Sequence, residues 1–250
     1  MIGIIVSGGI SFLVVIFSTL IGVNFFKSRN IGQEIQEEVD FHDHKKGTPT
    51  MGGLFIVFGT FAGYALSHIN FWTIGEGFKV EITSMNSNIL LIFGIAFSMA
   101  LVGLLDDFLK VKAGRNLGLK PSQKLILQTL VGLVSAYYFL YLNYDSSFYF
   151  FSGLGFDIGI LKWLVIIFFI IGITNSVNFT DGLDGLVAGS SAISFGGILI
   201  ISFWIYRHPE YYSRFIGQSF LTVEISLLIS AVAGACLGFL WWNTNPAKII

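Results

Sequence analysis

Long apolar stretches, separated by short polar connections, run along the whole chain. A helix of roughly 20 apolar residues crosses the hydrocarbon core of a bilayer, and backbone groups in lipid must pair within their own segment. We predict seven transmembrane helices, at 2–26, 51–69, 89–108, 122–142, 159–178, 187–206 and 219–242. The first stretch lacks a basic leader and a small-residue cleavage site, so we interpret it as a retained helix and not a signal peptide.

The composition supports this interpretation. Of the 250 residues, 54% are hydrophobic and only 12% are charged, about half the ~25% that is usual in soluble domains. We therefore predict an all-α polytopic membrane protein with a single domain over residues 1–250. The net charge of −1 gives no basic footprint for nucleic acid. The single cysteine, Cys236, excludes an intramolecular disulfide.

The distribution of lysine and arginine predicts the orientation in the membrane. With seven spans, ten of these residues fall on one side: Lys27, Arg29, Lys45, Lys46, Lys110, Lys112, Arg115, Lys120, Lys124 and Lys248. Four fall on the other side: Lys79, Lys162, Arg207 and Arg214. By the positive-inside rule the first side is cytoplasmic and the N-terminus is outside. The unusual polar motifs of the chain all lie on the predicted cytoplasmic side.

One of these motifs is NSVNFTDGLDGL, residues 175–186, which follows an apolar run. Asn175, Asn178, Asp181 and Asp184 recur every three residues and would share one face of a helix. Polar groups at the end of a membrane helix are candidates for function. The alternative is a simple helix stop, because Asp-Gly favours turns. Two asparagines with a doubled Asp-Gly favour the functional interpretation.

A second motif is the adjacent pair Asp106 and Asp107, which follows a long apolar run. Lys110 lies three and four residues further on, so a surface ion pair worth about 0.3–0.5 kcal/mol is the simplest interpretation. Adjacent carboxylates repel each other, however, and a cation such as Mg²⁺ relieves that repulsion with the oxygen ligands it prefers. The pair is therefore also a candidate metal site.

A third motif is KKGTPTMGGL, which leads into the second apolar stretch. Its glycines and its lysines, Lys45 and Lys46, suit phosphate binding at a helix start. An ordinary basic loop with a Pro/Gly turn explains the lysines equally well. We interpret the nearby His42 and His44 as solvated side chains, because no further histidine converges on them.

Taken together, one face offers carboxylates for a divalent metal, lysines for phosphates and asparagines for recognition, beside a lipid-accessible helix bundle. Such a face suits a charged, phosphate-bearing substrate from the cytosol that meets something in the bilayer. Phosphoryl transfer to a membrane-embedded acceptor fits this combination, with catalysis mainly by positioning and metal neutralisation.

Five segments resemble, in order and spacing, the motifs of a known enzyme family. They are KKGTPTMGGL, LVGLLDDFLKV, PSQKLILQ, TNSVNFTDGLDGLVAG and NTNPAKI. The family is MraY, the phospho-N-acetylmuramoyl-pentapeptide-transferases, within the polyprenyl-phosphate N-acetylhexosamine-1-phosphate transferase superfamily. The resemblance covers nearly the whole chain, and the GTPTMGG and NxxNxTDGLDGL elements together are highly specific.

The resemblance implies a Mg²⁺-dependent enzyme of the bacterial inner membrane with a cytoplasmic active face. It would transfer phospho-MurNAc-pentapeptide from UDP-MurNAc-pentapeptide to undecaprenyl phosphate, which yields lipid I and UMP in peptidoglycan biosynthesis. The implied catalytic and metal-binding residues are Asp106, Asp107 and Asp181, with Asp106 the preferred base for the lipid phosphate. The implied substrate-binding residues are Lys45, Thr50, Lys110, Lys120, Lys124, Asn175, Asn178, Gly182, Leu183, Asp184 and Asn243. Direct attack and a covalent aspartyl intermediate both fit this pattern, and the oligomeric state stays open, a homodimer included.

The chain departs from the family pattern in length. The family has about ten spans where we predict seven, and its further metal-binding aspartate would come after Ile250. We therefore expect the chain to be incomplete at its C-terminus, with uncertain activity by itself.

Three alternatives remain open at this stage. A UDP-GlcNAc or UDP-GalNAc polyprenyl-phosphate transferase of the same superfamily is the nearest. A secondary transporter would place its polar groups near the bilayer midplane within repeated halves, which this sequence does not show. A non-catalytic membrane protein is the third.

Overall fold

The structure is a computed structural model that describes residues 2–29, 48–73, 77–113, 118–139, 161–211 and 219–250. Each of the seven predicted segments contains a helix. The long helices are α1 (Ile2–Ser28), α2 (Gly53–Leu66), α3 (Ser87–Ala113), α4 (Pro121–Tyr137), α6 (Leu161–Thr180), α7 (Leu186–Arg207) and α9 (Ser219–Asn243). A two-stranded hairpin of β1 (Ile69–Thr73) and β2 (Gly77–Ile82) follows α2.

Five of the seven helices are long and apolar enough to cross a membrane: α1, α3, α6, α7 and α9. The chain is therefore a multi-pass, all-α membrane protein, as predicted. α4 has 17 residues and α2 only 14, about 21 Å at 1.5 Å per residue. We predicted the second apolar stretch to be helical as far as residue 69, but α2 ends at Leu66. The chain turns there and enters β1 at Ile69, so the end of the apolar run belongs to a strand.

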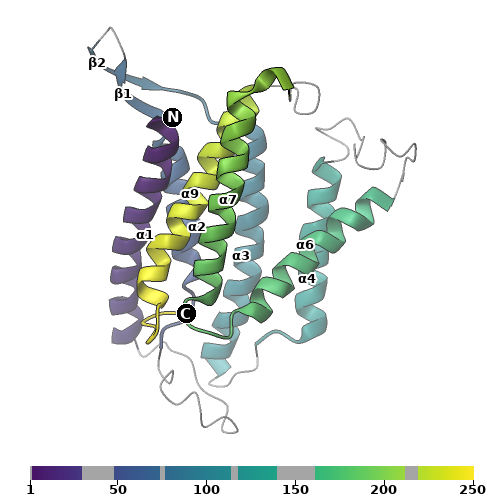
Figure 1. Cartoon of the computed structure of the whole chain (residues 1–250). Helices are drawn as coiled ribbons and strands as arrows, with labels where there is room; N and C mark the ends of the chain where they lie inside the picture. The colour runs from purple at the N-terminus through teal and green to yellow at the C-terminus, as the bar shows by residue number, and fades with distance from the viewer. Residues whose placement is uncertain (1, 30–47, 74–76, 114–117, 140–160, 212–218) are drawn as a thin grey trace.

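The helices form a close bundle with a pair standing apart (Figure 1). α9 packs against α1, α2 and α7, and α3 flanks this group. α4 and α6 pack mainly on each other, and α3 links α4 to the rest. The N-terminus lies at the end of the bundle that carries the hairpin, which we call the hairpin end, and the C-terminus lies at the opposite end.

Small residues allow the central helices to approach closely. A Cβ atom on Gly234 of α9 would lie 2.1 Å from the carbonyl oxygen of Gly8 on α1. A Cβ atom on Gly63 of α2 would lie 2.5 Å from the carbonyl oxygen of Ser7. The Ser7 hydroxyl donates a hydrogen bond to the carbonyl oxygen of Leu227 at 2.9 Å. Glycine and serine at helix contacts are typical of membrane bundles. Lipid tails are as apolar as the side chains, so the helices are held together by close backbone packing and not by burial of apolar surface.

The hairpin connects the second and third apolar stretches. Its strands are antiparallel, with Ile69 opposite Ile82 and Trp72 opposite Phe78. The backbone N–H of Thr83 donates to the carbonyl oxygen of His68 at 3.0 Å, which closes the base of the hairpin. The sequence also suggests a short hairpin around Ser152–Gly155, but these residues lie outside the described ranges.

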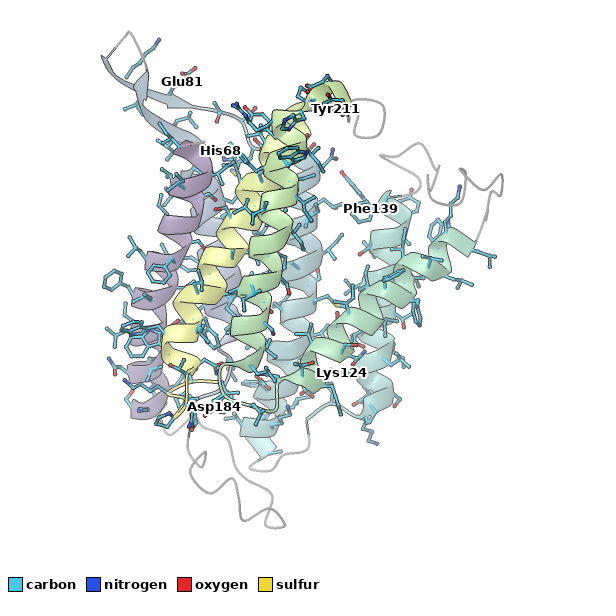
Figure 2. The ribbon with its side chains drawn as sticks, viewed as in Figure 1. His68, Glu81, Lys124, Phe139, Asp184 and Tyr211 are labelled. Atoms are coloured by element: carbon cyan, nitrogen blue, oxygen red, sulfur yellow. The ribbon has the colours of Figure 1, made fainter. Side chains whose placement is uncertain are left out.

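A buried polar cluster joins α2 to α9 near the hairpin end, where Figure 2 labels His68. The Tyr64 hydroxyl donates a hydrogen bond to the carboxylate of Glu224. His68 Nε2 lies 3.2 Å from both oxygens of that carboxylate, and His68 Nδ1 lies 2.9 Å from the Tyr64 carbonyl oxygen. All three side chains are buried. Burial without such partners costs several kcal/mol, so each side chain depends on the others for its place in the bundle.

We expect Glu224→Ala to destabilise the protein. The substitution leaves the Tyr64 hydroxyl and His68 Nε2 buried without their acceptor, which should lower the free energy of unfolding by at least about 2 kcal/mol. Thermal unfolding in detergent, followed by tryptophan fluorescence, measures the effect. Glu210→Ala, which removes an exposed carboxylate, is the control and should leave the melting temperature unchanged. Equal melting temperatures for the two variants would contradict the assigned role of Glu224.

Candidate functional site

The sequence motifs meet at the end of the bundle opposite the hairpin, which we call the motif end. α2, α4 and α7 begin there, and α3, α6 and α9 end there. Figure 2 shows Lys124 of α4 and Asp184 at this end, far from His68 and Glu81. Segments about 200 residues apart in the sequence are therefore gathered at one end of a membrane bundle, as the predicted topology of seven spans requires. That this end faces the cytoplasm stays a prediction.

Asp106 and Asp107 lie within α3, which continues to Ala113, five residues beyond its predicted end. Lys110 Nζ lies 2.6 Å from Asp106 Oδ2 and 3.4 Å from Asp107 Oδ1. The ion pair expected from the spacing is therefore formed. It involves both carboxylates, so a single lysine offsets part of the repulsion between them.

The second oxygen of Asp106 holds the segment that leads into α4. The backbone N–H of Leu119 donates to Asp106 Oδ1 at 2.8 Å. A Cβ atom on Gly118 would lie 2.4 Å from the same oxygen, so the close approach of this segment requires glycine. α4 then begins with Pro121 at a helix start, where a missing N–H costs nothing. The buried carboxylate of Asp106 thus connects α3 to the first turn of α4.

A pocket of about 490 Å³ opens beside Asp106, between α3, α4 and α6. Its lining combines charged, amide and apolar groups: Asp106, Lys110, Gly118, Leu119, Pro121, Lys124, Leu125, Gln128 and Asn175. At its border Lys124 Nζ donates to the Asn178 side-chain oxygen at 3.1 Å. Two lysines and a carboxylate therefore lie together beside the α4–α6 pair, which stands apart from the bundle.

A second group of site residues surrounds Asn243. Its Oδ1 accepts the backbone N–H of Gly185 at 2.9 Å, and its Nδ2 donates to the carbonyl oxygen of Ile249 at 2.9 Å. Asp184 Oδ2 accepts the backbone N–H of Ala247 at 3.1 Å. Gly185 has φ +77°, a conformation that favours glycine, at the start of α7. Asn243 and Asp184 therefore hold the residues that follow α9 (244–250, the C-terminal turn) against the turn that precedes α7.

The segment before α2 is fastened to the same C-terminal turn. Gly52 N–H donates to the carbonyl oxygen of Ile250 at 3.0 Å, and Ile250 N–H donates to that of Pro49 at 2.9 Å. Between them Met51 has φ +73°, which a side chain rarely adopts. The hydroxyl oxygen of Thr50 is buried and, within the described part of the chain, has no hydrogen-bond partner. A strained turn beside an unsatisfied hydroxyl is typical of a ligand-binding loop.

The sequence matches one known protein family and one short family signature. Residues 89–250 match glycosyl transferase family 4, and residues 45–57 match phospho-N-acetylmuramoyl-pentapeptide-transferase signature 1. Proteins with the name phospho-N-acetylmuramoyl-pentapeptide-transferase are similar along nearly the whole chain. The protein from Corynebacterium efficiens is 37% identical over 98% of this chain and 71% of its own length. The corresponding values are 38%, 99% and 69% for Oceanobacillus iheyensis, and 36%, 98% and 72% for Salinispora arenicola. The chain belongs to the phospho-N-acetylmuramoyl-pentapeptide-transferase family.

Within this transferase family member, the predicted site residues fall into two groups at the motif end. Asp106, Lys110, Lys124 and Asn175 line the pocket, and Asn178 borders it. Thr50, Asp184 and Asn243 lie in or near the turns that the C-terminal segment holds together.

The remaining predicted residues lie outside these two groups. Asp181, Gly182 and Leu183 form the exposed turn between α6 and α7, where Gly182 N–H donates to the carbonyl oxygen of Thr180 at 2.8 Å. Lys120 precedes α4, and its N–H donates to the Gln123 side chain at 3.0 Å. Lys45 lies outside the described residues. The catalytic and binding roles of all these residues stay predictions.

The predicted Mg²⁺ site also stays a prediction. In the described ranges, no group of three or more His, Cys, Asp or Glu side chains is placed to share a metal ion. Mg²⁺ is commonly bound by one or two carboxylates together with waters and substrate phosphates. The adjacent carboxylates of Asp106 and Asp107 fit that pattern in type and number, with Lys110 as their present counter-charge.

Our interpretation of the sequence missed Gln128. This side chain lines the pocket but is only 1% exposed, in the middle of an apolar helix. The signal was available: Gln128 and Thr129 interrupt the run LILQTLVGLV, and a buried amide in a membrane helix needs a polar partner. A single glutamine gives no spacing pattern, however, and its partner lies 47 residues away.

Proposed function

We propose that this protein transfers phospho-N-acetylmuramoyl-pentapeptide from UDP-MurNAc-pentapeptide to undecaprenyl phosphate, which produces lipid I and UMP for peptidoglycan biosynthesis. The relatives that cover nearly the whole chain carry the name of this activity. The observation that carries the proposal is the pocket at the motif end, where a carboxylate and two lysines lie at the side of a membrane bundle.

The chemistry of the pocket suits the lipid phosphate as the attacking group. One of its oxygens forms the new bond to the sugar-bearing phosphorus of the nucleotide, and the phosphoanhydride bond to UMP breaks. Asp106 faces the pocket and is the residue we assign to take the proton of the lipid phosphate. Lys110 and Lys124 attract phosphates and help to hold them in line, since phosphoryl transfer depends mainly on positioning and charge neutralisation.

Asp106 and Asp107 would hold Mg²⁺ when it is bound, with Asp181 as a further candidate ligand. The ion would neutralise charge on the phosphate oxygens of the nucleotide. Binding of the ion would also compete with Lys110 for the two carboxylates, which leaves that lysine available to a substrate phosphate.

We propose that the nucleotide binds at the segments that are hydrogen-bonded around Asn243. They bring together the signature segment, the Asp-Gly turn and the C-terminal turn, and they include the unsatisfied hydroxyl of Thr50. We propose that Lys45 and Asp184 also border this nucleotide, whereas Asn178 borders the pocket beside Asp106. Both polar side-chain atoms of Asn243 are hydrogen-bonded to backbone groups. We therefore propose that Asn243 shapes this side of the nucleotide site, which we call the nucleotide wall.

We further propose that the motif end faces the cytoplasm, in the bacterial inner membrane. In the topology predicted from the sequence, ten of the 14 lysine and arginine residues fall on that side, and the nucleotide substrate is a cytosolic compound in this proposal. The hairpin end would then face outward.

The experiment that tests the function is transfer of labelled UDP-MurNAc-pentapeptide to undecaprenyl phosphate in detergent, with Mg²⁺ or with EDTA. It is run on the 250-residue chain and on a chain extended by the C-terminal part of the Oceanobacillus iheyensis relative. We expect lipid-linked label with Mg²⁺ in at least one of the two chains, and none with EDTA. Label from UDP-GlcNAc in place of UDP-MurNAc-pentapeptide would assign the protein to a sister activity, and absence of label in both chains would reject the proposal.

A further inference from the structure

Gln128 is the most deeply buried polar residue that lines the pocket beside Asp106. It is 1% exposed and lies in α4 among leucine, isoleucine and valine. A buried amide costs free energy unless it is hydrogen-bonded. Gln128 forms its bonds across the helix contact: Asn175 Nδ2 of α6 donates to Gln128 Oε1 at 2.8 Å, and Gln128 Nε2 donates to Asn175 Oδ1 at 3.4 Å.

This reciprocal amide pair has a neighbour one helical turn away. Lys124, four residues before Gln128, donates to Asn178, three residues after Asn175, at 3.1 Å. The two contacts form a polar ladder between α4 and α6. The amide pair is the inner rung, and the outer rung includes a lysine of the pocket.

The ladder is important because α6 depends mainly on α4 for its packing. Within that helix only Lys162 is buried, and α6 packs mainly on α4. At the apolar part of the contact, Gly132 of α4 faces Ile167 of α6. Apolar contacts in lipid specify register weakly, because the lipid tails are equally apolar, whereas interhelical hydrogen bonds specify it. A shift of α6 along α4 would move Asn175 and release Lys124 from Asn178.

We propose that Gln128 is a positioning residue for the phosphate of the lipid acceptor. Through Asn175 it fixes α6 against α4, and thereby holds the inner wall of the pocket and the ammonium group of Lys124 where that phosphate binds. The inference rests on the proposed function, because it assigns the pocket to the acceptor and not to the nucleotide. The nucleotide wall around Asn243 is built on other helices and does not depend on this ladder.

Steady-state kinetics test this role. Gln128→Leu should raise the KM for a polyprenyl monophosphate at least tenfold, while the KM for UDP-MurNAc-pentapeptide stays within about twofold. The exchanged pair Gln128→Asn with Asn175→Gln keeps two amides of the same total length and should recover most of the acceptor KM. Thr129→Val, which alters a neighbouring polar residue that bonds only its own helix at Leu125, is the matched control. An unchanged acceptor KM in Gln128→Leu, or equal changes in both KM values, would overturn the proposal.

A binding measurement separates this proposal from the proposed reaction. A polyprenyl monophosphate should raise the melting temperature of the unsubstituted chain more than the corresponding alcohol does, and Gln128→Leu should lose that difference. Retention of the full difference by folded Gln128→Leu would overturn the positioning role. If no label is transferred but the phosphate-dependent difference is present and sensitive to Gln128, the reaction is wrong and the acceptor pocket stands. If Gln128→Leu does not fold, the exchanged pair decides, and failure of that pair to bind the phosphate would overturn the proposal.

Discussion

Asp106→Asn is expected to reduce transfer of the sugar phosphate at least about a hundredfold, with the folded state retained. Asparagine has nearly the same shape, and its side-chain oxygen can still accept the N–H of Leu119. It cannot take the proton of the lipid phosphate, and it removes the charge that Lys110 pairs with at 2.6 Å. General-base groups typically contribute 10²–10⁴-fold to a rate. The initial rate of label transfer measures the loss, and the melting temperature and gel-filtration profile establish folding.

The control for this experiment is Glu210→Gln, which changes an exposed carboxylate near the hairpin end and should leave the rate unaltered. A rate for folded Asp106→Asn close to that of the unsubstituted protein would remove Asp106 from the mechanism. Asp107, which does not line the pocket, would then become the candidate base.

Gly234→Leu is expected to prevent folding. The first side-chain atom alone would lie 2.1 Å from the carbonyl oxygen of Gly8 and 3.0 Å from its Cα, and backbone atoms cannot give way as the end of a flexible side chain can. α1 and α9 would have to separate along their whole contact. We expect a loss of at least about 3 kcal/mol, above the usual cost of overpacking. The amount of monodisperse protein recovered in detergent is the measurement.

Gly196→Leu on α7 is the matched control, because a Cβ atom there meets nothing within 4 Å. Normal recovery is expected for this variant. If Gly234→Leu and Gly196→Leu give equal amounts of folded protein, the close approach of α1 and α9 is not required for the bundle.

The sequence predicted the helices well because apolar length is a local property. Each of the seven stretches contains a helix, and the polar motifs lie at one end of the bundle, as a topology of seven spans predicts. The end of α2 was predicted too late because Ile69 is equally compatible with a helix or a strand. Only the pairing of β1 with β2, which is not local, decides between the two.

The internal organisation of the site was less accessible from the sequence. The family resemblance implied that Asn243 binds substrate, but its side-chain oxygen accepts the backbone N–H of Gly185, 58 residues away, and its side-chain nitrogen donates to the carbonyl oxygen of Ile249 in the following turn. Gln128 gave no repeat and has its partner in another helix. Such contacts depend on how helices are placed against one another, which composition and spacing do not specify.

In the reaction proposed above, the two groups of residues at the motif end would give the two substrates perpendicular routes. The water-soluble nucleotide would reach the turns around Asn243 along the bundle axis, whereas the lipid would reach the pocket between α3, α4 and α6 sideways, within the plane of the membrane. An inhibitor that mimics the nucleotide must therefore cross the full thickness of the membrane if it is supplied from the hairpin side. A membrane-soluble compound that competes with the acceptor reaches its target by lateral diffusion, whichever side it is applied to.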